Sequence, residues 1–113
     1  MIDIFSDLKE TGYKVWQQGS APKTIPDKFI TVWNTSSVDK IVADNKVRSI
    51  EYSFNVIFYT KSYDNIYSDM EKIIRLLKSK NYEIDGYGFD APSGMEDYIA
   101  RGVEALKIEK LGG

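Results

Sequence analysis

Four carboxylates near the C-terminal end are the side chains best suited to chemistry: Asp85, Asp90, Glu96 and Asp97. Carboxylate oxygens are the ligands that Mg²⁺ and Ca²⁺ prefer, so a cluster of this kind could hold a hard cation. The spacing does not match an EF-hand loop, and the group flanks an Ala-Pro-Ser-Gly turn, where carboxylates are ordinarily solvated. We therefore predict no metal site and no cofactor.

Composition removes most other catalytic chemistry. The 113 residues contain no Cys and no His, which excludes thiolate catalysis, Ser-His mechanisms and the commonest metal ligands. The formal charge of −2 comes from 15 basic and 17 acidic residues without a basic run, so tight DNA binding is not expected. No apolar stretch reaches the roughly 20 residues of a membrane helix, and the start lacks the pattern of a signal peptide. We predict a protein that is not an enzyme and is made in the cytoplasm.

The first third of the chain predicts a short helix, a strand, a connector and a second strand. Ile2, Phe5 and Leu8 recur at helical spacing before Gly12, which indicates a helix over about residues 2–11. Residues 13–17 are strand-like, residues 19–26 contain two prolines and form a surface loop, and residues 29–33 are β-branched or aromatic.

The middle of the chain predicts a long strand followed by an amphipathic helix. Apolar and polar residues alternate over 47–59, so one face belongs to the core and the other to solvent or a partner. Ser62 is placed to cap a helix over 63–80, and Asn81 is suited to the left-handed position at its end.

Two hairpins complete the predicted architecture. Residues 36–46 read as a polar loop of about eleven residues, long for a hairpin, so they form a projecting functional loop or the flanking strands continue into them. Residues 82–89 and 99–111 predict a closing hairpin with glycine bulges. Together these elements predict one α+β domain over 1–113, with a short N-terminal helix and strand, a long β-hairpin, an amphipathic helix on one face of a mostly antiparallel sheet, and a closing β-hairpin.

The last two residues, Gly112 and Gly113, allow an alternative function. Ubiquitin-like modifiers and sulfur carriers end in Gly-Gly and have a β-grasp fold of hairpin, helix and further strands, which the chain from Phe29 onward could imitate. The extra helix and strand before the hairpin count against this alternative, and a terminal Gly-Gly is also an ordinary frayed end.

Several short motifs occur together in an order that covers nearly the whole chain. A proline precedes Phe29-Ile30-Thr31, Ala43-Asp44-Asn45 lies in the hairpin loop, Tyr59-Thr60-Lys61 ends the long strand, and Leu76 to Tyr82 closes the helix. In this order the chain resembles the siphophage tail terminator, or tail completion, proteins. Asn81 stands where that family usually has glycine, a tolerable exchange at a left-handed cap.

The resemblance implies a structural head-tail joining protein in the virion. Its copies would form a hexameric ring at the head-proximal end of the tail tube, contact the major tail tube protein and the head connector, and let DNA pass without specific binding. From the residues, we expect contact sites in the hairpin loop and the last turn, although the apolar loop residues could instead pack on the domain's own sheet. The candidates are Val38, Asp39, Lys40, Ile41, Asp44, Asn45 and Lys46 in the loop, and Met95 and Tyr98 in the turn.

Overall fold

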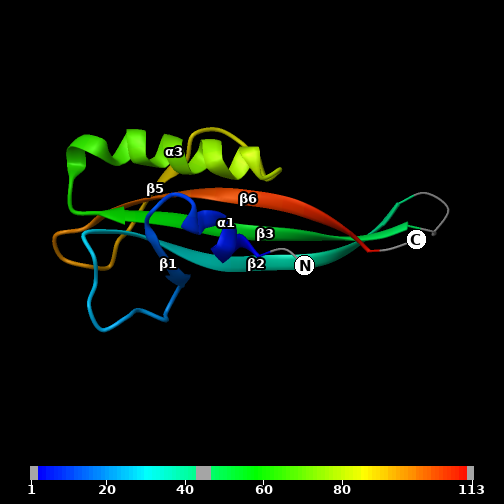
Figure 1. Cartoon of the computed structure of the whole chain (residues 1–113), viewed down its shortest axis with the longest axis horizontal. Helices are drawn as coiled ribbons and strands as arrows, with labels where there is room; N and C mark the ends of the chain where they lie inside the picture. Colours follow the sequence, from blue (N-terminus) through cyan, green and yellow to red (C-terminus); the bar gives the residue numbers. More distant parts are fainter. Residues whose placement is uncertain (1–2, 43–46, 112–113) are drawn as a thin grey trace.

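The predicted α+β architecture is confirmed by the structure, a computed structural model that describes residues 3–42 and 47–111. One six-stranded sheet has the order β1-β2-β3-β6-β4, with β5 also paired to β6, and all its pairings are antiparallel except β1 with β2. Figure 1 shows α3 lying along one side of this sheet. The elements are α1 (Ile4–Lys9), β1 (Lys14–Gln17), β2 (Lys28–Val42), β3 (Val47–Thr60), the 3₁₀ turn η1 (Tyr63–Asn65), α3 (Ile66–Ser79), β4 (Glu83–Ile84), β5 (Phe89–Ala91) and β6 (Ile99–Leu111).

The main core lies between the sheet and the two helices. Apolar residues at helical spacing on α3 meet alternate residues of the strands, and Ile4 and Leu8 of α1 close the same layer. Asn81 has a φ of 71°, which confirms the predicted left-handed end of α3. Ser62 makes no side-chain cap hydrogen bond, so that prediction is wrong, because the chain enters α3 through η1 instead. The fully buried residues of this layer include Phe58, Leu8, Ile30, Met70, Ile73, Leu77, Val56 and Val103.

A smaller core lies on the opposite face of the sheet, which we call the open face because neither helix covers it. Phe29 stacks between Trp16 and Tyr59, with ring centroids 4.5 and 4.6 Å away, and the loops before β2 and before β6 pack around these rings. Ser49 and Ser53 of β3 also point toward this face and are 2% and 8% exposed. This side of β3 was expected to face solvent or a partner, but at these two positions the chain itself covers it.

The predicted loop over 36–46 is largely strand, as its second alternative anticipated. β2 continues to Val42 and pairs with β3 as far as Val47, while residues 43–46 lie outside the described part of the chain. Figure 1 shows the long strands extending beyond the end of α3, and the molecule measures 53 Å along its longest axis against 28 and 23 Å along the others.

The predicted strand over 82–89 is instead two short strands. β4 and β5 both pair with β6, and the connection between them contains Gly86 and Gly88 at positive φ, so the glycines interrupt the strand where bulges were expected. Gly102 lies in a regular part of β6 directly beneath Phe89, where a Cβ would come within 3.0 Å of the Phe89 ring. A side chain at 102 would therefore push β5 away from the sheet.

Candidate assembly interface

The candidate interface is built on the arm, which we define as residues 33–42 of β2, 47–52 of β3 and 107–111 of β6. β1 pairs with β2 only through Phe29 to Val32, and β4 pairs with β6 only through Ala105 and Leu106. Among the strands that the structure describes, no strand pairs with the outer edge of β2 or of β6 beyond these points. The arm therefore presents backbone hydrogen-bonding groups along both sides.

A bulge in β2 decides which side chains of the arm reach the open face. The register with β3 shifts between Asn34 and Ser36, so that Thr35 is the additional residue. Both Asn34 Nδ2 and Thr35 Oγ1 donate to the carbonyl oxygen of Ser53 at 3.1 Å, and Ser37 Oγ donates to Asn34 Oδ1. This polar run thus stabilises the bulge through its own side chains. Because one residue is inserted, Trp33 and Val38 point toward the same face although their numbers differ by five.

Exposed apolar residues collect on the open face. Val38, Glu51 and Ile108 form one cross-strand row over β2, β3 and β6, and Trp33 lies in a parallel row farther from the tip. Val38 is 48% exposed, Ile108 52% and Trp33 48%. Phe89 of β5, which faces Gly102, adds a fourth exposed apolar side chain to this side. Large apolar side chains that share one face in this way are typical of contact surfaces.

The structure places four of the predicted loop contact residues, from Val38 to Ile41, on the β2 arm. Val38 is exposed on the open face, whereas Asp39 is exposed on the helix side and takes part in an interaction within the chain. The backbone at Lys40 and Ile41 belongs to β2. Asp44, Asn45 and Lys46 lie outside the described residues, as do Gly112 and Gly113 of the alternative carrier function.

The two predicted contact residues in the last turn pack against their own domain. Met95 and Tyr98 are half-buried against the smaller core, and the Tyr98 hydroxyl donates to the carbonyl oxygen of Pro26 at 2.8 Å. Lys61 lies 5.3 Å from the centre of the Tyr98 ring. This turn is far from the arm in Figure 1, so it is a separate surface.

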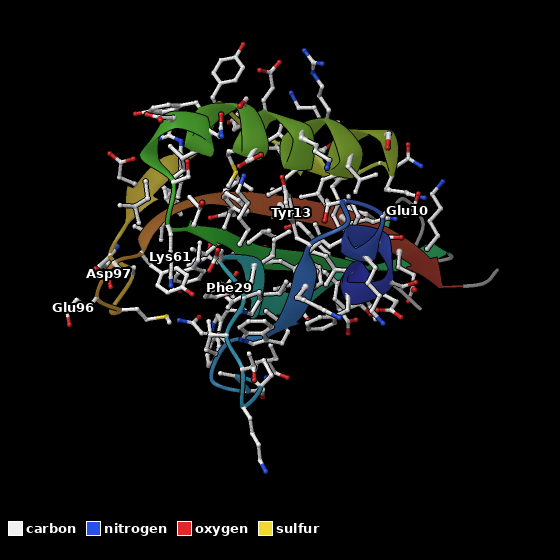
Figure 2. All side chains as sticks on the ribbon, turned by 60° about the vertical axis from the view of Figure 1, so that its left-hand side comes forward. Glu10, Tyr13, Phe29, Lys61, Glu96 and Asp97 are labelled. Carbon is white, nitrogen blue, oxygen red and sulfur yellow. The ribbon has the colours of Figure 1, made fainter. Side chains whose placement is uncertain are left out.

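The four carboxylates of the C-terminal region do not converge. Asp90 pairs with Arg101 at 2.7 Å, and Figure 2 shows Glu96 and Asp97 pointing outward from the turn that bears them. Within residues 3–42 and 47–111, no group of three acidic side chains is arranged to hold a metal ion. Arg101 also donates to the Gly88 carbonyl and lies 4.9 Å from the Tyr67 ring, so this cluster fastens the β4–β5 connection to the sheet.

Two tyrosines, the half-buried Tyr13 and the buried Tyr82, connect the N-terminal elements to the helix α3 and to the start of β4. The Tyr13 hydroxyl donates to Asp69, which also pairs with Lys28 at 2.8 Å, and Figure 2 shows Tyr13 pointing toward the helix. Burial and the Asp69 carboxylate raise the pKa of Tyr13 to about 12. Burial and a hydrogen bond to Asp7 likewise raise the pKa of Tyr82. These contacts stabilise the domain that supports the arm.

Sequence reasoning missed Ile108 and the direction of Trp33. Ile108 reads as one more apolar residue of a closing strand, and only the register with Glu51 shows that it shares a row with Val38. The Asn34-Thr35-Ser36-Ser37 run was the available signal, because side chains of these types bond to nearby backbone and favour bulges as well as loops.

Comparison with known proteins does not assign the chain to a family. No family model matches the chain, and no curated protein is similar to it in sequence. In the described part of the chain, no helix is long and apolar enough to cross a membrane.

Proposed function

We propose that the chain is a structural assembly protein of a tailed phage or phage-derived particle. In this role its copies form a ring, as a hexamer, at the head-proximal end of the tail tube. The ring stops polymerisation of the tube protein and offers a face to the head connector. The resemblance to tail terminators, carried by the co-occurring motifs at Phe29, Asp44, Tyr59 and Leu76, supports the proposal.

The observation that carries the proposal is the arm. Two strand edges without a partner strand among the described residues flank a face on which Val38, Trp33 and Ile108 are about half exposed. Long unpaired edges of this kind favour aggregation of a monomer, because they can pair with strands of other chains. In an assembly protein the same edges can form the contacts between subunits. The arm is therefore the surface through which we expect the chain to work.

Contacts with the two other partners are assigned to separate surfaces. The segment from Lys40 to Lys46, which contains the contact residues expected from the sequence, is proposed as one docking surface. The turn with Met95 and Tyr98, at the other end of the long axis, is proposed as the second. A net charge of −2 suits a lumen through which DNA must pass without being gripped.

The proposal is tested on particles. Deletion of the gene from a phage that encodes the chain should give tails of variable length that fail to join heads, and a labelled copy should lie at the head-tail junction. Restoration by the wild-type gene is the control. Heads and tails that join normally without the protein would refute the proposal.

A further inference from the structure

We infer that copies of this chain join head to tail by sheet continuation, with the outer edge of the β2 arm of one copy pairing with the outer edge of the β6 arm of the next. The pairing is a property of the chain alone. Only the closure of the resulting oligomer into a ring rests on the proposed function.

The directions of the strands make the two edges complementary. β2 and β6 both run antiparallel to β3, which lies between them, so they are parallel to each other and both run toward the arm tip. A second copy in the same orientation therefore brings its β6 edge alongside the β2 edge as a parallel pair. Such a contact joins two different surfaces, so it repeats from copy to copy and closes into a ring if the rotation permits.

The side chains at the two edges also fit a second copy. Val38 and Ile108 are the two ends of one row, and each has its outer side open. Sheet continuation places Val38 of one copy beside Ile108 of the next, so both apolar side chains become covered in one contact. A monomer that lacked this contact would leave both exposed at the sheet edges.

The charges that could protect the β6 edge are partly turned away from it. Edge lysines commonly prevent strand pairing, but Lys107 lies 4.6 Å from the centre of the Tyr82 ring of its own chain. In the same register Asp39 and Glu109 become neighbours on the helix side, and each already interacts within its own chain. Repulsion between these two carboxylates should make the association stronger at higher salt.

Disulfide trapping tests the pairing, because the natural chain contains no cysteine. Val38 and Ile108 are separated by β3, so their Cα atoms are about 9–10 Å apart within one copy, which is too far for an internal disulfide. On mild oxidation, the double variant Val38→Cys with Ile108→Cys should give a ladder of covalent oligomers. An equal mixture of the two single variants should give dimers.

Three comparisons make the result decisive. Each single variant alone should form no disulfide-linked oligomer, and a double variant at exposed positions away from the arm, Lys23→Cys with Glu71→Cys, should give no ladder. Dimers of Val38→Cys alone as abundant as those of the mixture would show a symmetric contact and overturn the inference. No ladder from the double variant at the highest soluble concentration would overturn it as well.

The same samples separate this inference from the proposed function. If the double variant forms rings but gives no disulfide between Val38→Cys and Ile108→Cys on oxidation, the tail role stands and the edge pairing is refuted. A disulfide ladder from the double variant, together with unaffected tails after deletion of the gene, would support the edge pairing and refute the tail role. Ile108→Lys serves as a second variant, because a half-exposed side chain can change to lysine without loss of the fold, and it should shift the oligomer toward monomer.

Discussion

Replacement of Gly88 by alanine tests how the short strand β5 is held on the sheet. Gly88 has a φ of 101°, and a Cβ there would lie 2.8 Å from the carbonyl oxygen of Gly102, a backbone atom that cannot turn aside. Gly86 has a φ of 77° and no atom within 4 Å of its Cβ position, so Gly86→Ala is the matched control. Both variants share the left-handed strain of an L-residue, roughly 1–2 kcal/mol, and the opposing effect of a lower conformational entropy in the unfolded chain.

The difference between the two variants isolates the steric term. Overpacking of this kind costs about 1–3 kcal/mol. The unfolding free energy of Gly88→Ala should therefore be lower than that of Gly86→Ala by this amount. For a chain of 113 residues the unfolding entropy is about 0.24 kcal/mol/K, so each kcal/mol lowers Tm by about 4 °C. We expect Gly88→Ala to melt about 4–12 °C below Gly86→Ala in thermal unfolding followed by circular dichroism. Equal melting temperatures would show that β5 does not depend on the close approach of Gly88 to β6.

Three further predictions concern the supporting domain and the β2 bulge of the arm. The pKa of Tyr13 is raised from 10.0 to about 12, so the stability that this group contributes is complete below pH 10 and is lost as pH rises through 12. In denaturant unfolding, Tyr13→Phe should lose less unfolding free energy over this pH window than the wild type. An equal loss in both proteins would contradict the raised pKa. Asn81→Ala should lower the unfolding free energy by about 1–2 kcal/mol in the same assay, because φ at this position is 71°. Asn81→Gly should leave the unfolding free energy unchanged. Equal losses in the two variants would exclude the left-handed cap as the cause. Asn34→Ala removes three hydrogen bonds at the β2 bulge and should cost about 1–3 kcal/mol, with faster amide exchange confined to the arm. Unchanged exchange in the arm would contradict the role of Asn34.

Periodicity was sufficient to predict the elements that form the main core. The alternation at Phe54, Val56 and Phe58 and the helical spacing at Ile66, Met70 and Ile73 each bury one face, and the structure places both faces in the same layer. These signals are local, because they depend only on neighbours in the same element. The fold class could therefore be predicted without any knowledge of strand register.

The arm could not be predicted, because its features depend on pairings between distant residues. Ser36 and Ser37 are poor strand formers by themselves, yet the pairing with β3 and the bonds of the bulge keep them in β2. The position of Ile108 beside Glu51 likewise requires the register of β6, which nothing local specifies. Of the predicted loop residues, Val38 thus belongs to the candidate site, whereas the other half of the site, on β6, was missed.

The central claim, that this chain works by assembly through its arm, is tested most directly by tail length in a complemented deletion. Electron micrographs would compare tails made with the wild-type chain and with Ile108→Lys, after thermal unfolding has shown that both fold equally well. Wild type should restore tails of uniform length joined to heads, and Ile108→Lys should leave the length variable. Uniform, joined tails with Ile108→Lys would contradict the account.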